Sequence, residues 1–269
     1  LKTIRPVVAR TEVGQRVPLP RRPMLYHERA LFTDLDQNLL GNAADLPRLM
    51  AVLRKNRKST TFGIATGRRL DSALKALSQH RIPEPDVLIT SSGTAIYYNP
   101  DLTEDSWWTQ HIDRRWSPRK VKQALADLPG LELQPKARQS RFKISYFYNC
   151  EVAPPLEEIN SLLYQEDLAA NVTLSFGQYL DILPLRASKG QALRYVADLW
   201  GMPLDHILVA GGSGADEDMM RGNTLAVVVE NRHHEELSHL VDSDRIYYAQ
   251  QAYALGILEA IEHFNFFEL

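Results

Sequence analysis

The sequence predicts an α/β fold, with a Rossmann-like parallel-sheet core and an inserted α+β segment. Three observations indicate this. Short buried strands alternate with amphipathic helices from residue 30 to residue 90, which is typical of a parallel sheet covered by helices. Between residues 113 and 185 the order changes to helix, strand, helix, strand, strand, and one of these strands alternates with period two as antiparallel strands do. The strand–helix alternation then returns and continues to the end of the chain.

The elements before the insertion follow from short apolar runs and from helical spacing of apolar residues. They are expected at Ala30–Thr33 (strand), Asp45–Arg57 (helix), Thr60–Ala65 (strand), Thr66–Arg68 (turn), Asp71–His80 (helix) and Pro85–Thr90 (strand). In the first helix, Leu46, Leu49 and Leu53 fall on one face. Each strand ends in polar residues, so the chain presents possible ligand-binding groups at three successive strand ends.

The insertion and the second half are interpreted in the same way. Within the insertion we expect helices at Trp116–Leu128 and Pro155–Leu168, and strands at Phe142–Tyr148, Val172–Phe176 and Tyr179–Leu183. Ser117 and Pro118 suit the N-cap and the first position of the first of these helices. After it we expect helices at Gly190–Trp200, Asp218–Arg221, Glu235–Val241 and Ala252–Phe264, and strands at His206–Ala210 and Leu225–Val229.

The domain boundaries follow from these patterns. Residues 28–112 and 186–269 are expected to form the core, and residues 113–185 the inserted segment. Residues 1–27 carry six basic side chains before residue 23, together with four prolines, and are expected to be a basic, Pro-rich linker. The chain starts with Leu1 rather than Met, so we expect a chain that was processed or cut from a longer one; a disordered tail of an independent protein is the alternative.

Composition excludes several classes of protein. The net charge is 31 − 33 = −2, so no overall field would recruit nucleic acid or an acidic membrane. No apolar run is long enough to span a bilayer, and no signal-peptide core lies near the start. Cys150 is the single cysteine, which excludes an intrachain disulfide and a Cys-based zinc site. A reducing, cytoplasmic location is the simplest expectation.

Asp34 and Asp36 directly follow the first predicted strand, where ligands bind in open α/β sheets. A carboxylate there can attack phosphorus and form an acyl phosphate, while a second one protonates the leaving oxygen and later activates water. The alternative is that these acids only cap a helix or form a turn.

Three further elements have a similar double interpretation. Thr66-Gly67-Arg68 offers a hydroxyl and backbone N–H groups to a phosphate, or merely caps a helix. Lys189 can neutralise a phosphate, or is a surface lysine. The loop Gly211–Asp218 is rich in glycine and acids, and can hold Mg²⁺ or form a flexible turn.

Taken together and in this order, the four elements resemble the haloacid-dehalogenase-like phosphohydrolases. The sequence is most similar to the sucrose-phosphate phosphatase family, over about residues 29–265. The segments that carry the resemblance are Phe32–Asn38 with Gly41, Ala65–Arg68, Pro85–Thr90 with Gly93-Thr94 and Ile96-Tyr97, and Leu180–Pro184 with Lys189-Gly190. The start of the chain makes it resemble most the phosphatase-like C-terminal region of a bacterial sucrose-phosphate synthase, which implies a covalently linked glycosyltransferase domain.

The resemblance implies a role for each matching residue. Those matched to catalytic positions are Asp34 (nucleophile), Asp36 (general acid/base), Thr66 (phosphoryl hydrogen bond) and Lys189 (charge neutralisation). Those matched to Mg²⁺ are Asp34, Asp36 and Asp216. Those expected at the sugar phosphate are Gly67 and Arg68 in the core and Lys143, Gln178 and Tyr179 in the insertion, which matches the family's cap; the last three could equally be rim residues.

The sequence departs from the family pattern in the glycine-rich loop. Gly212 stands where the family has its first acid, and Ala215 where it has Asn. A lost charged ligand weakens Mg²⁺ binding, and a loss of ~3 kcal/mol corresponds to roughly a hundredfold in rate. Two functions therefore stay open: a Mg²⁺-dependent sugar-phosphate phosphatase, for sucrose 6-phosphate or another hexose phosphate, and a weak or inactive domain that binds sugar phosphate or regulates an adjacent synthase domain.

Overall fold

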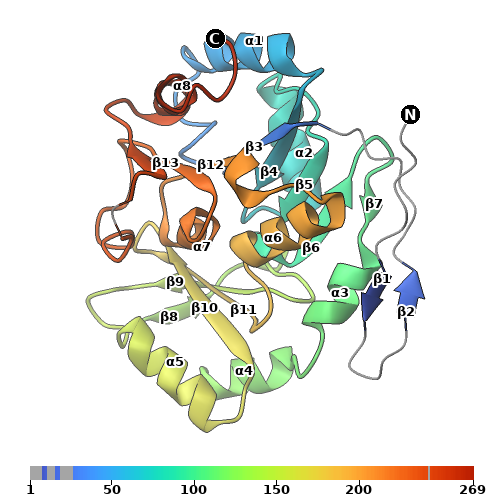
Figure 1. Ribbon diagram of the computed structural model, residues 1–269. Coiled ribbons are helices and arrows are strands. Elements are labelled where there is room, and N and C mark those ends of the chain that lie inside the picture. Colours follow the sequence, from blue (N-terminus) through green and yellow to red (C-terminus); the bar gives the residue numbers. More distant parts are fainter. Residues whose placement is uncertain (1–7, 11–15, 19–26, 242) are drawn as a thin grey trace.

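The computed structural model describes residues 8–10, 16–18, 27–241 and 243–269 (Figure 1). The predicted linker at residues 1–27 lies largely outside the described residues. Within it, β1 (Val8–Arg10) and β2 (Arg16–Pro18) pair as a two-stranded antiparallel sheet. No helix in the described ranges is long and apolar enough to cross a membrane.

The core is built on one mainly parallel sheet, which among the described residues has eight strands. In spatial order they are β14 (Ile246–Tyr248), β13 (Leu225–Val228), β12 (Ile207–Gly211), β3 (Arg29–Thr33), β4 (Thr60–Ala65), β5 (Val87–Thr90), β6 (Ala95–Tyr98) and β7 (Thr103–Glu104). The strands from β14 to β5 pair in parallel, while β6 and β7 are antiparallel. The predicted fold class is confirmed.

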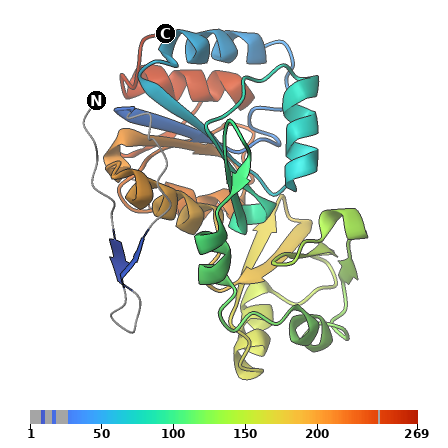
Figure 2. The same ribbon diagram turned by 90° about the vertical axis from the view of Figure 1, so that its right-hand side faces the viewer.

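Helices cover both faces of this sheet, and the alternation of side chains decides which residue meets which layer. Along β3, Leu31 packs toward α1 (Leu46–Asn56), α2 (Leu70–Gln79) and α8 (Tyr253–His263). Phe32 packs on the other face toward α3 (Ser106–Ile112), α6 (Lys189–Trp200) and α7 (Glu217–Met220). Figure 2 shows α1 and α8 lying together on one side of the sheet.

A second, antiparallel sheet lies between α3 and α6 in the sequence. Its strands in spatial order are β10 (Ala170–Ser175), β11 (Tyr179–Pro184), β9 (Ile144–Tyr148) and β8 (Leu131–Leu133). Two helices cover one face of it, α4 (Pro118–Ala124) and α5 (Leu156–Gln165). We call residues 118–184 the cap. It forms a separate lobe below the core in both ribbon views (Figures 1 and 2).

The two faces of the cap sheet differ in character. Ile144 and Ile182 point toward α4 and α5 and are fully buried in the cap's own hydrophobic core. Their neighbours Ser145 and Asp181 therefore point to the opposite face, which no cap helix covers. This open, polar face is the one that meets the core.

Most predicted elements are present with bounds shifted by one or two residues. The helix predicted at Trp116–Leu128 is shorter, because α4 ends at Ala124 and turns follow. The helix predicted at Glu235–Val241 is wrong. That segment forms successive turns, with hydrogen bonds from Ser238 N to the Glu235 carbonyl and from Leu240 N to the Leu237 carbonyl. The strands β6, β7, β8 and β14 and the helix α3 were not predicted.

Candidate active site

The four sequence elements meet at one edge of the core sheet. β12, β3, β4 and β5 are consecutive neighbours in the sheet and run parallel, so the residues that follow them lie at the same edge. Asp34 follows β3, Thr66 follows β4, Ser92 follows β5 and the glycine-rich loop follows β12. The first residue of α6, Lys189, reaches the same place.

Lys189 is the centre of a buried ionic cluster. Its ammonium lies 2.9 Å from Asp34 Oδ1 and 2.7 Å from Asp216 Oδ1, and all three side chains are at most 7% exposed. Gly93 lets the backbone after β5 pack on the start of α6, because a Cβ there would lie 2.2 Å from the carbonyl carbon of Ser188. The position of Lys189 is thus fixed by its own helix and by the loop against it.

The charges in this cluster do not cancel, and the pKa values reflect this. Burial raises the pKa of Asp34 to about 7; the charge of Lys189 opposes this rise, and the charges of Asp216 and Asp36 add to it. Burial alone would lower the pKa of Lys189, but the two carboxylates beside it outweigh that effect and raise the pKa. Lys189 is therefore a permanent cation, whereas Asp34 can hold a proton near neutral pH.

Asp216 is held by the loop that precedes it. Its Oδ2 accepts hydrogen bonds from Gly212 N, Ser213 N and Ser213 Oγ, each at 3.0 Å, in a capping-box arrangement. Its Oδ1 is taken by Lys189. Both oxygens of Asp216 are thus occupied, and its clear role in this arrangement is to hold the lysine.

Asp36 is engaged by an arginine from the next strand end. Arg68 donates from Nε to Asp36 Oδ2 at 2.8 Å and from Nη2 to Asp36 Oδ1 at 2.7 Å, which is the bidentate geometry that suits Arg and carboxylate. The hydrogen bond to Asp36 is the main cause that raises the pKa of Arg68. Thr66 is fully buried, and its hydroxyl accepts a hydrogen bond of 3.2 Å from Arg68 N.

The cap contributes a second polar network above this site. Lys143, which is 4% exposed, donates to Ser145 Oγ at 2.6 Å and lies 3.3 Å from Asp181 Oδ1. Ser145 Oγ donates to the same Asp181 oxygen at 2.6 Å. The other oxygen of Asp181 accepts from Ser92 Oγ of the core at 2.6 Å. Asp181 thus joins the cap to the end of β5.

These groups enclose a cavity of about 270 Å³ between core and cap. The residues that line it are Asp34, Asp36, Gln37, Gly67, Arg68, Ser92, Gln134, Arg138, Lys143, Ser175, Phe176, Tyr179, Asp181, Lys189, Ser213 and Ala215. Of the predicted site residues, Thr66 and Asp216 lie buried beside this cavity rather than on its wall. Gln178 is exposed in the turn between β10 and β11 and does not line the cavity.

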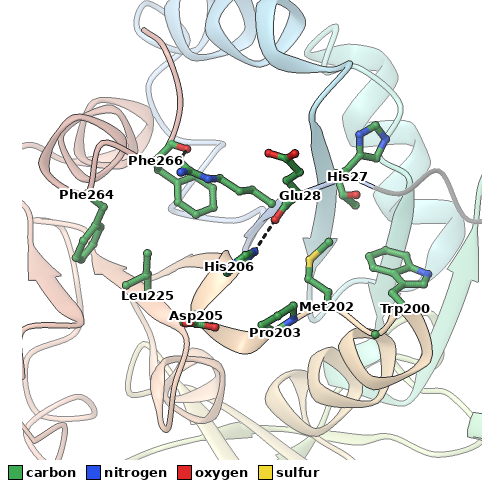
Figure 3. Close-up of a pocket in the computed structure, with 13 residues that line it drawn as sticks. His27, Glu28, Trp200, Met202, Pro203, Asp205, His206, Leu225, Phe264 and Phe266 are labelled. Atoms are coloured by element: carbon green, nitrogen blue, oxygen red, sulfur yellow. Dashed lines mark hydrogen bonds between the residues drawn. The ribbon is translucent and has the colours of Figure 1, made fainter.

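A larger cavity of about 620 Å³ lies at the opposite edge of the sheet (Figure 3). Its walls include Arg29 and Leu225, the first residues of β3 and β13, and Thr61, the second residue of β4. His206 Nδ1 lies 2.9 Å from the carbonyl oxygen of Glu28 in its wall. No residue predicted to carry chemistry lines it, so the smaller cavity is the candidate active site.

The donor set suits a hard cation only in part. Asp34 faces the cavity with a buried carboxylate in an excess of negative charge, which favours an oxygen-bound cation. Asp216 and Asp218 are both occupied, the latter by Arg194 Nη2 at 2.6 Å and by Ser188 Oγ. In the part of the chain that the structure describes, no group of three or more His, Cys, Asp or Glu side chains gathers into a metal site.

Comparison with known proteins agrees with this arrangement of groups. A sequence model of the family described as Sucrose-6F-phosphate phosphohydrolase matches residues 27–265. The chain belongs to this family. The match covers both halves of the core and the whole cap.

The chain is also similar to a solved structure and to other proteins with assigned names. The sucrose-phosphatase from Synechocystis sp. PCC6803, solved with sucrose and phosphate, has a TM-score of 0.86 and 29% identity, covering 90% of this chain and 100% of that chain. The mannosylfructose-phosphate phosphatase of Agrobacterium fabrum is 29% identical over 88% of this chain and 97% of its own length. A probable sucrose-phosphatase of Arabidopsis thaliana, number 3a, is also 29% identical, but the chain spans only 59% of its length.

Several cavity residues of this family member were not predicted from its sequence. They are Gln37, Ser92, Gln134, Arg138, Ser175, Phe176, Asp181, Ser213 and Ala215. Ser92 carried a local signal in the sequence, because it follows a predicted buried strand. In the structure it adopts a left-handed conformation at φ 61°. Asp181 carried a weaker signal, as an acid on the polar side of an alternating strand. Gln37, Ser213 and Ala215 lie on the core loops that follow β3 and β12, beside residues that were predicted, whereas the remaining cap residues reach the cavity only through the packing of cap on core.

Proposed function

We propose that this protein hydrolyses a sugar phosphate, with sucrose 6-phosphate as the first candidate, to the free sugar and phosphate. The observation that carries the proposal is the convergence of Asp34, Asp36 and Lys189 on one cavity roofed by a polar cap face. The family is one of sucrose-phosphate phosphohydrolases, and the similar proteins of Synechocystis and Agrobacterium are phosphatases of sugar phosphates, which supports the same reaction class.

The reaction would proceed in two displacements at phosphorus. A carboxylate oxygen of Asp34 attacks phosphorus, and the bond from phosphorus to the sugar oxygen breaks while Asp36 gives that oxygen a proton. Water then attacks the acyl phosphate, Asp36 takes the proton of the water, and phosphate leaves with Asp34 restored. Asp36 must exchange its bond to Arg68 for one to the sugar oxygen during this cycle.

The other residues bind and orient in this proposal. Lys189 offsets the charge of the transferring phosphoryl group from its fixed position between two carboxylates. The backbone at Gly67 and the side chain of Arg68 line the cavity and would contact the phosphate or the sugar, while Thr66, buried beside the cavity, supports them through the hydrogen bond from Arg68 N. In the cap, Lys143 and Tyr179 face the sugar. Gln178 is left out of the site, since its side chain does not line the cavity.

We further propose that Mg²⁺ is bound by the carboxylate of Asp34 and the main-chain carbonyl of Asp36, with water completing its shell. When bound there, Mg²⁺ would neutralise charge on the phosphoryl oxygens. Asp216 would ligate the ion only if it gave up Lys189 or the amides of Gly212 and Ser213. Mg²⁺ binding is accordingly expected to be weak.

A second candidate function is a non-catalytic module that binds sugar phosphate or regulates an adjacent glycosyltransferase domain. The observation that favours it is Gly212, which leaves the loop without its first acid while Asp216 and Asp218 are both engaged. A module of this kind would keep the cavity and lose turnover.

Two measurements separate these functions. Phosphate release from sucrose 6-phosphate and from a panel of hexose phosphates, with Mg²⁺ and with Asp34→Asn as control, tests the phosphatase; release no faster than that of the control would reject it. Calorimetry that shows sugar-phosphate binding without hydrolysis or Mg²⁺ uptake would support the binding module. A large rate increase in Gly212→Asp would mean that the natural loop limits a working enzyme.

A further inference from the structure

Glu236 connects the core to the cap at a place that the predicted chemistry does not use. One of its carboxylate oxygens accepts a hydrogen bond of 2.6 Å from Gly177 N in the cap. The other accepts a hydrogen bond of 2.6 Å from Gly214 N in the glycine-rich loop of the core. The Glu236 side chain is only 6% exposed. Each oxygen of this buried carboxylate thus accepts a hydrogen bond from a backbone amide of a different lobe.

The same contact requires a close approach of the two backbones. A Cβ on Gly214 would lie 2.6 Å from the carbonyl oxygen of Leu174 in β10, although Gly214 itself has no left-handed conformation. Glycine is needed there for space and not for backbone freedom. His233 lies against the cap as well, with its Nε2 3.2 Å from where a Cβ of Gly177 would be.

On the core side, the residue bonded to Glu236 lies next to the residues that hold Asp216. Gly214 follows Gly212 and Ser213, whose amides hold Asp216, and Asp216 in turn holds Lys189. The cap side leads to the cavity wall, because Ser175, Phe176 and Tyr179 flank the turn that contains Gly177. Glu236 thus ties the cap turn that flanks the cavity to the core at Gly214, whereas the amides that hold Asp216 belong to Gly212 and Ser213 and are not bonded to Glu236.

We propose that Glu236 is a positioning residue that holds the cap closed on the core and so sets the sugar-binding half of the cavity. This role rests on the proposed function. It does not place Glu236 in contact with substrate. Its loss should weaken the reaction of a substrate that needs the cap, and should spare a small phosphate ester that needs only the core.

The test compares three variants of the full chain. Glu236→Gln replaces one acceptor oxygen with an NH₂ group that faces an N–H donor, so one of the two bonds is lost. Gly214→Ala keeps residue 236 as Glu and pushes the cap away, because the new Cβ would lie 2.6 Å from the Leu174 carbonyl oxygen; this Cβ would also lie 3.2 Å from Glu236 Cβ. Glu235→Gln makes the same charge change on the neighbouring exposed residue and is the matched control. Thermal melting of each variant establishes that it is folded.

KM and turnover are measured with sucrose 6-phosphate and with p-nitrophenyl phosphate as substrates. We expect KM for sucrose 6-phosphate to rise at least about tenfold in Glu236→Gln and Gly214→Ala, as for loss of a hydrogen bond to a charged group. Turnover of p-nitrophenyl phosphate should change less than about twofold, and Glu235→Gln should match the unaltered chain. Equal losses on both substrates, or no loss on either, would overturn the proposal.

Hydrogen exchange gives an answer that does not depend on activity. Amides of residues 174–179 should exchange at least about tenfold faster in Glu236→Gln, while those of β12 keep their rate. If the unaltered chain hydrolyses neither ester, the proposed function fails, and hydrogen exchange alone tests whether Glu236 holds the cap on the core. Unchanged exchange at residues 174–179 would then refute it.

Discussion

The burial of Asp34 predicts that an inactive variant is more stable than the natural chain at alkaline pH. Asp34→Asn keeps the shape of the side chain and an oxygen for Lys189, but it cannot ionise. Asp34 has a pKa of about 7 in the folded chain against 3.8 for the free side chain. The folded state therefore binds a proton between these values that the unfolded state has lost.

The sign and size of the effect follow from this difference in pKa. Because the folded pKa is raised, the free energy of unfolding falls as pH rises from about 4 to 7 and then levels off. The slope is about 1.4 kcal/mol per pH unit, so the natural chain loses roughly 3 kcal/mol between pH 5 and pH 8 on account of this group. Asp34→Asn has no such loss.

Urea denaturation of both proteins at pH 5 and pH 8, with a chelator present, measures this effect. We expect the stability of Asp34→Asn relative to the natural chain to increase by roughly 3 kcal/mol from pH 5 to pH 8. Saturating Mg²⁺ should shrink that gain, since the ion replaces the missing positive charge. A difference that stays constant between the two pH values would mean that Asp34 is ionised at both, and the reasoning from burial would be wrong.

Three further substitutions test the framework around the cavity. Lys189→Met leaves two buried carboxylates facing each other, so thermal or urea denaturation should show a loss of about 3–5 kcal/mol; a loss below ~1 kcal/mol would contradict it. Ser92→Ala removes the bond to Asp181, and steady-state kinetics should show KM raised severalfold with stability changed by about 1 kcal/mol or less. Gly93→Ala collides with Ser188 at a φ of +96°, and should reduce the phosphatase rate far more than a surface substitution does; an unchanged rate would mean that the loop does not position the lysine.

The parallel core, apart from β14, could be predicted because each of its strands is a short buried run that the local sequence indicates. Thr60–Ala65 carries no charged residue and every residue of β4 is buried, so the run alone indicates a central strand. The antiparallel strands β6, β7 and β8 are only two to four residues long and carry no comparable signal. Such strands exist because a neighbour is already present to pair with them, which no single stretch of sequence reveals.

The failed helix at Glu235–Val241 shows how tertiary contacts override local spacing. Leu237 and Leu240 are three residues apart and both buried, which fits a helix face as well as two successive turns. His233 N donates to the carbonyl of Gly212, and Glu236 is drawn to backbone amides of two other segments. These long-range bonds decide in favour of turns.

The site residues also differ in whether local sequence or long-range packing determines their position. Asp34, Asp36 and Lys189 could be found because each follows or begins an element whose direction in the sheet was predictable. Asp216 was predicted as a cation ligand, although the spacing of Ser213 and Asp216 is that of a capping box, and the structure uses it in that way. In the cap, Lys143 and Tyr179 were predicted, but Asp181 was not, because its partner Ser92 comes from the core, more than eighty positions away.

The charges at the phosphate end of the cavity connect stability with chemistry. Asp34, Asp36 and Asp216 face Lys189 and Arg68, which leaves one negative charge in excess before a phosphate arrives. Two like charges 4 Å apart repel by about 4 kcal/mol at an effective dielectric constant of 20. Burial, with a smaller contribution from this repulsion, favours a proton on Asp34 in the free chain, but a protonated carboxyl is a poor nucleophile. In the proposed mechanism a cation takes the place of that proton, so calorimetry should find Mg²⁺ bound roughly tenfold more weakly at pH 6 than at pH 8. Equal affinity at the two pH values would mean that Asp34 does not bind the cation.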